Sequence, residues 1–143
     1  MVRSRLRADD GFSLVEILVV ILIIGIVAAI ALPAFLNQRS KAQDAHAQTY
    51  VTTAAKALSV WETEHGTFED ATPADLTRVE PALGQARGLT ITAGARTYTV
   101  SVDSLAGGAY SIQRHASGAL VRSCTEPGVG SCDETADAQG NRW

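Results

Sequence analysis

The 143-residue sequence has few aromatic residues, few cysteines and no excess of positive charge. Because aromatic residues make up only 6% of the chain, any soluble core must rest mainly on Ala, Val, Leu and Ile. Two cysteines are too few for a zinc site without histidine ligands, and they suit one disulfide. The formal net charge of −3 argues against a dedicated nucleic-acid-binding protein, which would show a basic patch.

Motifs that carry enzyme chemistry are also missing from the sequence. It contains no phosphate-binding loop, no GxSxG nucleophile motif and no HExxH zinc motif. The three histidines, His46, His65 and His115, lack the spacing of metal ligands, and we expect His46 and His65 on the solvated surface of the helix. We therefore expect no enzyme activity, no metal site and no cofactor.

Hydrophobic residues make up 46% of the chain and are concentrated near its N-terminus. The run from Ile17 to Leu36 carries no charge, and as a helix it would span roughly 30 Å, the thickness of a bilayer core. A buried helix of a soluble protein would keep a polar stripe, which this run lacks. We predict a transmembrane helix. Arg3, Arg5 and Arg7 precede it, so the N-terminus is expected on the cytoplasmic side and the remaining chain outside.

Two features distinguish this segment from a simple anchor. Glu16 places a carboxylate at its start, and an unpaired acid at mid-membrane costs about 2.5–3.5 kcal/mol, with a smaller cost near the interface. Either this side chain snorkels to the headgroups or it has a function. In addition, the composition changes abruptly from charged to apolar at the Gly11–Phe12 junction.

Residues 11–41 resemble the N-terminal signature of type IV pilins and other members of the type IV filament superfamily. That signature is a short charged leader ending in Gly, then Phe, a small hydroxyl residue, two apolar residues and Glu, before a long apolar segment. Each element is present here, as Gly11, Phe12, Ser13, Leu14, Val15 and Glu16, and Gly25, Pro33 and the following FLNQR also match. One departure is Asp10, where Lys or Arg is common; acidic residues there are common in high-GC Gram-positive relatives.

The resemblance implies a specific processing and assembly pathway. A membrane aspartyl protease, the prepilin peptidase, would remove the leader (residues 1–11) by cutting between Gly11 and Phe12, and the new Phe12 amine would be N-methylated. In the filament, Glu16 would neutralise the Phe12 amine of a neighbouring subunit. The implied partners are other pilin copies in a homopolymer, the peptidase, the pilus assembly platform and its ATPase, and membrane lipid before assembly. The subunit would be a single-pass protein of the cytoplasmic membrane and then part of an extracellular surface filament.

Gly25 and Pro33 both weaken a helix, because Gly has a low helix propensity and Pro removes a backbone N–H. In the family, the segment between such positions can lose its helicity in the assembled filament. We expect an intact but kinked helix in the free subunit. Two interpretations stay open for the filament: local melting from Gly25 to Pro33, or a simple kink.

The rest of the chain predicts an α+β fold of the type IV pilin kind. We divide it into a filament-core helix (12–36), an amphipathic helix half (37–66), and a connector, sheet and C-terminal loop (67–143). Apolar residues at three- and four-residue spacing mark the amphipathic half, and Gly66 is expected to end it; they are Ala47, Tyr50, Val51, Ala54, Leu58 and Trp61. The connector, residues 67–88, has one expected helical turn near 74–79. Alternating runs at 89–93, 96–102, 110–114 and 119–123 predict three or four antiparallel strands that cover the helix.

The C-terminal region contains both cysteines and one tryptophan. Outside the membrane, Cys124 and Cys132 are expected to form a disulfide, worth roughly 2–3 kcal/mol for so short a loop. Two free thiols are the alternative. Trp143 either folds back onto the domain or forms a subunit contact.

Four functional hypotheses follow. The leading one is a structural pilin subunit of a type IV pilus-like filament; such subunits serve adhesion, motility, DNA uptake and secretion. The second is a minor pilin or a pseudopilin of a secretion or DNA-uptake machine. The third is a secreted binding domain, released by signal peptidase at the Ala-x-Ala site that ends at Ala31. The fourth is an uncleaved single-pass anchor for such a domain.

Overall fold

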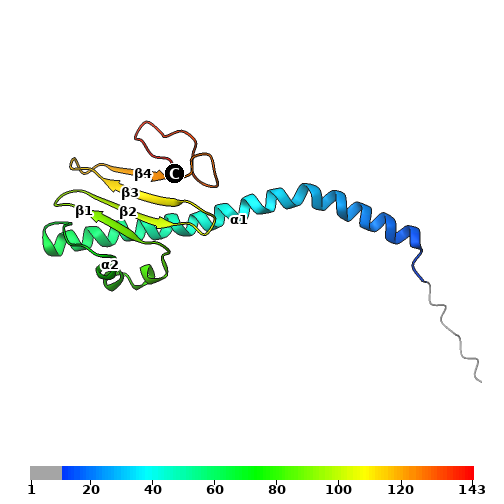
Figure 1. Ribbon diagram of the computed structural model, residues 1–143, viewed down its shortest axis with the longest axis horizontal. Helices are drawn as coiled ribbons and strands as arrows, with labels where there is room; N and C mark the ends of the chain where they lie inside the picture. Colours follow the sequence, from blue (N-terminus) through cyan, green and yellow to red (C-terminus); the bar gives the residue numbers. More distant parts are fainter. Residues whose placement is uncertain (1–10) are drawn as a thin grey trace, which may run out of the picture. The chain divides into compact units, whose positions relative to one another are not determined.

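The computed structural model describes residues 11–143. The predicted leader therefore lies outside the described residues, apart from Gly11. The described residues fall into two units, residues 11–36 and residues 37–143, and one helix, α1 (Leu14–His65), belongs to both (Figure 1).

The described part of the first unit is the N-terminal half of α1. The Ser13 carbonyl accepts hydrogen bonds from the backbone N–H groups of Glu16 and Ile17, at 3.0 and 3.2 Å, and so opens the helix. The helix continues through Gly25 and Pro33 without a break, which matches the expected intact helix, and the expected kink stays a prediction. Because proline has no N–H, the carbonyl four residues before Pro33 lacks its usual helical donor.

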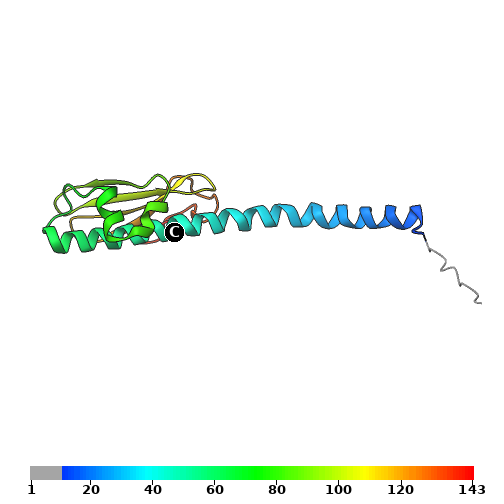
Figure 2. The same cartoon turned by 90° about the horizontal axis from the view of Figure 1, so that it is seen from below.

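The second unit is a four-stranded antiparallel sheet with α1 against one face. The strands are β1 (Thr90–Ala93), β2 (Tyr98–Asp103), β3 (Ala109–Arg114) and β4 (Leu120–Cys124), and they lie in the order β1-β2-β3-β4. Val100 at the centre of β2 pairs with Ile91 on one side and with Ile112 on the other. Figure 2 shows the sheet and α1 of this unit as two layers. The predicted α+β fold with a strand meander is confirmed, with each strand boundary within two residues of its expected place.

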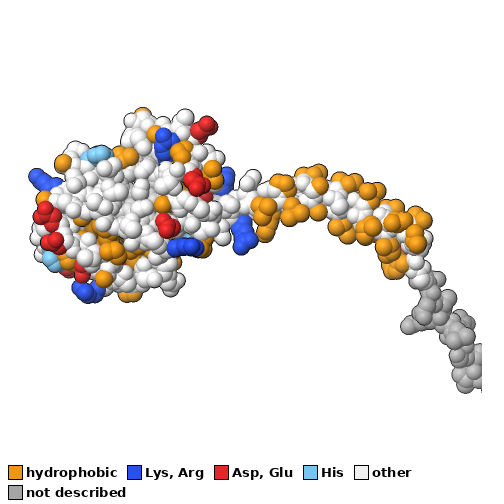
Figure 3. All heavy atoms as spheres, in the orientation of Figure 1, with side chains coloured by type: hydrophobic (Ala, Val, Ile, Leu, Met, Phe, Trp, Pro, Cys, Tyr) orange, Lys and Arg blue, Asp and Glu red, His pale blue; other side chains and the backbone are white. Residues whose placement is uncertain are grey.

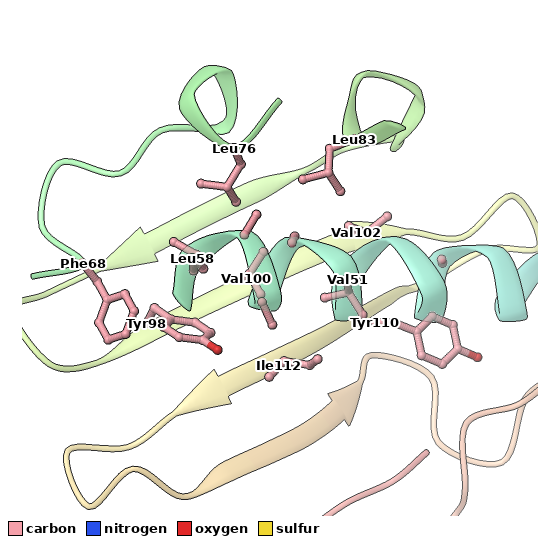
Figure 4. Packing of buried hydrophobic residues seen from close by; sticks show 14 of the residues in the cluster. Val51, Leu58, Phe68, Leu76, Leu83, Tyr98, Val100, Val102, Tyr110 and Ile112 are labelled. Carbon is pink, nitrogen blue, oxygen red and sulfur yellow. The ribbon is translucent and has the colours of Figure 1, made fainter. Parts of the chain in front are cut away.

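The core of the second unit lies between α1 and the sheet (Figure 4). From α1 it receives mostly small side chains, with Val51 and Leu58 as the large ones that are fully buried. The inward residues of the sheet alternate with outward ones along β2 and β3, as the two-residue period of a strand requires. The fully buried or nearly buried large side chains that complete this core are Phe68, Leu76, Leu83, Tyr98, Val100, Val102, Tyr110 and Ile112.

Two residues of the predicted apolar stripe are less buried than expected. Tyr50 is partly buried but still packs against the core cluster. Trp61 is only partly buried, and its ring stacks on that of His65 with centroids 3.7 Å apart. Phe68 instead fills this end of the core, where it packs edge-on to Tyr98 and lies beneath the Arg114 guanidinium. The helix period predicts Trp61 near the core, but the fully buried aromatic residue is Phe68, from the chain that follows the helix.

Short helical elements form the connector. Gly66 adopts φ +74° and ends α1, which confirms the predicted stop. Helix α2 (Pro73–Val79) begins with a capping box between Thr72 and Asp75, and it matches the helical turn expected near 74–79. The 3₁₀ helix η1 (Pro81–Gln85) was not predicted. Both elements add a leucine to the core, Leu76 from α2 and Leu83 from η1.

The C-terminal tail folds back along β4. Cys124 and Cys132 form a disulfide with Cα atoms 5.9 Å apart, so the free-thiol alternative is wrong. Trp143 donates from Nε1 to the Ser123 carbonyl at 3.0 Å and packs edge-on against Tyr110. Of the two interpretations of Trp143, the structure supports the one in which it folds back onto the domain.

Candidate assembly surface of the N-terminal helix

The N-terminal half of α1 exposes a continuous apolar surface. Every Val, Ile, Leu and Phe side chain from Phe12 to Leu36 is exposed, from 45% at Val20 to 76% at Phe12. Figure 3 shows these hydrophobic side chains along the N-terminal stretch of the helix. The most apolar stretch of α1 is long and hydrophobic enough to cross a membrane, with a mean hydropathy of 3.2 over 18 residues. An apolar surface of this length is unstable in water and requires either lipid or other protein to cover it.

Glu16 is the only charged residue between Phe12 and Leu36. It lies in the first turn of α1, where the free N–H groups at the helix start favour a negative charge. Within residues 11–143 its carboxylate forms no hydrogen bond or ion pair. In an apolar environment, this acid therefore needs a cationic partner from another molecule or contact with water.

The Gly11–Phe12 junction lies just before the helix. Residues 11–13 are not helical, and both Gly11 and Phe12 are exposed. Among residues 11–143, no atom other than those of the chain neighbours lies within 4 Å of the position that a Gly11 Cβ would occupy. A peptide bond in exposed, non-helical backbone is accessible to a protease, whereas one inside a helix is accessible only after the helix unwinds.

Gly25 and Pro33 lie on the same exposed stretch. Space is open around the position of a Gly25 Cβ, so the glycine is not required by any packing contact within residues 11–143. It lowers helix stability by roughly 1 kcal/mol relative to alanine, and Pro33 lowers it by about 3 kcal/mol. Judged by helix propensity alone, the segment between these two residues is therefore the least stable part of this helix half.

The sequence interpretation missed one buried charged group, Asp44. Its side chain is 3% exposed and lies on the same face of α1 as Ala47, Val51 and Leu58. The signal that could have found it is an acid at a position of the apolar stripe, three residues before Ala47. Such a residue needs hydrogen-bond donors from elsewhere in the fold.

The N-terminal segment matches a known family, the prokaryotic N-terminal methylation motif, over residues 6–32. The resemblance to type IV pilins is confirmed, and the long helix on an antiparallel sheet is consistent with the type IV pilin fold. Motif and fold thus define the class as type IV pilin-like.

Particular relatives agree with this class. The chain is 36% identical over 106 residues to fimbrial protein Q of Moraxella bovis, over 73% of this chain and 64% of the relative. It is 36% identical over 66 residues to type IV major pilin protein PilE1 of Neisseria gonorrhoeae, over 46% of this chain and 31% of the relative. Type II secretion system core protein G of Vibrio cholerae serotype O1 is 30% identical over 65 residues, which are 46% of this chain and 44% of that protein. The chain spans less than two thirds of the length of these relatives.

Proposed function

We propose that this chain is a structural pilin subunit that is cleaved after Gly11 and polymerises through its N-terminal helix into a type IV pilus-like surface filament. The observation that carries the proposal is the exposed apolar half of α1, joined to a unit that buries its own core. The methylation motif over residues 6–32 supports the same function.

Burial of the apolar half of α1 is favourable both in a lipid bilayer and among the helices of other copies. Burying one Leu, Ile or Val side chain is worth roughly 1.5–3 kcal/mol relative to water, so this helix half is never free in solution. Lipid covers it in the cytoplasmic membrane before assembly, and the helices of other copies cover it in the filament. Transfer from lipid to helix contacts changes little in hydrophobic energy, so specific polar contacts must set the order of subunits.

Glu16 supplies that specific contact. Cleavage after Gly11 creates an ammonium group on Phe12, which N-methylation leaves cationic. Two opposite charges 4 Å apart attract by about 1 kcal/mol in water and by about 4 kcal/mol at an effective dielectric constant of 20. Pairing of the Glu16 carboxylate with the Phe12 amine of a neighbouring copy therefore fixes the axial register of otherwise unspecific helices.

The pathway also requires three kinds of machinery. A prepilin peptidase must reach the exposed, non-helical Gly11–Phe12 bond, and an assembly platform with its ATPase must lift subunits from the membrane. Once extracted, the segment between Gly25 and Pro33 is where we expect helicity to be lost in the polymer, because both residues weaken it.

The N-terminal residue of the mature protein tests this pathway. Mass spectrometry and N-terminal sequencing of chain recovered from cells should find methylated Phe12. A mature chain beginning at Leu32 would identify a secreted domain cut at the Ala-x-Ala site, although that site lies inside α1. A chain still beginning at Met1 or Val2 would identify an uncleaved anchor.

Substitution of Glu16 tests the assembly step. Glu16→Gln should abolish filaments in sheared surface fractions while the processed subunit still accumulates in the membrane. Glu64→Gln is the matched control, because Glu64 is an exposed glutamate near the other end of α1 and should leave filaments intact. Normal filaments from the Glu16→Gln strain would overturn the proposed register contact.

A pseudopilin or minor pilin is the second candidate, supported by the similarity to the secretion system core protein G of Vibrio cholerae. The two functions differ in the abundance of the product outside the cell. A major pilin should dominate sheared surface material, whereas a pseudopilin or minor pilin should stay mostly with the membrane fraction.

A further inference from the structure

The buried Asp44 carboxylate joins three parts of the second unit. Its Oδ1 accepts a hydrogen bond from Ser104 Oγ at 2.6 Å, and Ser104, in the turn between β2 and β3, is itself only 6% exposed. Its Oδ2 accepts from the Ser131 backbone N–H at 2.9 Å. Ser131 lies in the loop closed by the Cys124–Cys132 disulfide.

Tyr110 borders the same carboxylate. Burial raises the pKa of the Tyr110 phenol well above its usual value, and the neighbouring Asp44 raises it further. The phenol therefore stays neutral beside Asp44. In Figure 4 the Tyr110 hydroxyl points away from the rest of the labelled apolar cluster.

The backbone of the disulfide loop packs closely against the Asp44 carboxylate. Gly130 adopts φ +62°, which side-chain-bearing residues rarely adopt, and a Cβ at this position would collide with Asp44 Oδ2. Ser131 follows Gly130 and precedes Cys132. The disulfide therefore restrains the Ser131 N–H, which donates a hydrogen bond to Asp44. The loop is further ordered by a hydrogen bond from the Gly128 N–H to the Cys132 carbonyl at 2.8 Å.

We propose that Asp44 is a redox-linked latch, which couples the Cys124–Cys132 disulfide to the docking of the C-terminal loop on α1. In the oxidised chain, the disulfide has already removed most of the entropy that ordering the Ser131 N–H would cost. In the reduced chain the loop is free to leave, and a buried carboxylate oxygen then loses its donor, which is unfavourable. Because linkage is reciprocal, the latch also makes the disulfide harder to reduce.

This inference concerns residues 37–143 and is independent of the proposed filament function. It gives the oxidised subunit a firmer connection between α1, the β2–β3 turn and the C-terminal loop than the reduced subunit has.

A redox titration of the full chain in detergent micelles tests the latch. Dithiothreitol transfers two electrons and two protons to the disulfide, so the Sγ–Sγ bond breaks, two thiols form, and dithiothreitol closes to its cyclic disulfide. At each ratio of reduced to oxidised dithiothreitol, free thiols are alkylated and counted by mass spectrometry. The Asp44→Ala variant should reach half-reduction at a ratio of reduced to oxidised dithiothreitol that is about tenfold lower than the ratio needed for the unsubstituted chain.

Two control variants separate the latch from general effects. Ser104→Ala removes the other partner of Asp44 without touching the loop, and Asp133→Asn removes an exposed charge next to Cys132. Both should keep the half-reduction ratio within about twofold of the original. A shift in either control as large as that of Asp44→Ala would overturn the proposal, as would an unshifted Asp44→Ala.

Tryptophan fluorescence establishes whether each variant is folded, since Trp61 and Trp143 both lie in the second unit. If Asp44→Ala does not fold, Asp44→Asn takes its place, because an amide oxygen accepts a weaker hydrogen bond than a carboxylate. A smaller shift in the same direction would then support the latch, and no shift would refute it.

Discussion

Leu58→Ala is the most direct test of how α1 holds the sheet. Most of the residues that α1 buries are alanines, namely Ala47, Ala54, Ala55 and Ala57. Leu58, with no exposed surface, is therefore one of two large side chains by which the helix fills the core. Figure 4 shows it among the labelled residues of the cluster. Truncating a fully buried leucine removes its transfer energy and leaves a cavity, which together cost about 3 kcal/mol.

Urea unfolding of the full chain in micelles measures this loss. The fluorescence of Trp61 and Trp143 reports on the second unit, whatever happens in the apolar half. With a slope of roughly 1.5 kcal/mol per molar urea, the midpoint should fall by about 2 M.

Val60→Ala is the matched control, because Val60 is 45% exposed on the same helix and should change stability by less than about 0.5 kcal/mol. Equal, small effects of both substitutions would refute the conclusion that the core rests on this face of α1.

Two further predictions concern the same unit. Replacing both Cys124 and Cys132 with serine should lower the free energy of unfolding by about 2–3 kcal/mol in the same urea assay; an unchanged midpoint would contradict a stabilising disulfide. Thr72→Ala should cost about 1 kcal/mol, because the Thr72 hydroxyl caps α2. The Thr72 hydroxyl is also the main cause that lowers the pKa of Asp75. The stability that the Asp75 charge adds is therefore present above the unfolded pKa of about 3.9 and is lost as the pH falls through the lower pKa of the folded state, whereas the cap on the Asp75 N–H does not depend on this charge. Carboxyl NMR titration should show the Asp75 pKa rising in Thr72→Ala, and an unmoved pKa would exclude the capping box as its cause.

The candidate site divides into residues that sequence could find and residues that it could not. Gly11, Phe12, Glu16, Gly25 and Pro33 belong to one contiguous motif. Glu16, Gly25 and Pro33 lie on α1, where their relative positions follow from their spacing alone. Their proposed roles in cleavage, methylation and assembly depend on a second molecule, and stay predictions.

The hydrogen-bond partners of Asp44 could not be predicted from the sequence. Its partners Ser104 and Ser131 are 60 and 87 residues away in the chain, so no local pattern pairs them. Trp61 is a second case: it fits the helical period yet is only partly buried, whereas Phe68, from a later segment, is fully buried against Tyr98.

Local chemistry determined the extent of the long helix, its apolar and amphipathic halves, the strand alternation and the cysteine pairing. Each depends on residue type at short spacing, which backbone geometry converts directly into a helix face, a strand face or a small closed loop. Only the tertiary structure decided which side chains fill the ends of the core and how the buried acid is satisfied. Those outcomes depend on the return path of the chain, because packing and hydrogen bonds join atoms that are close in space whatever their separation in sequence.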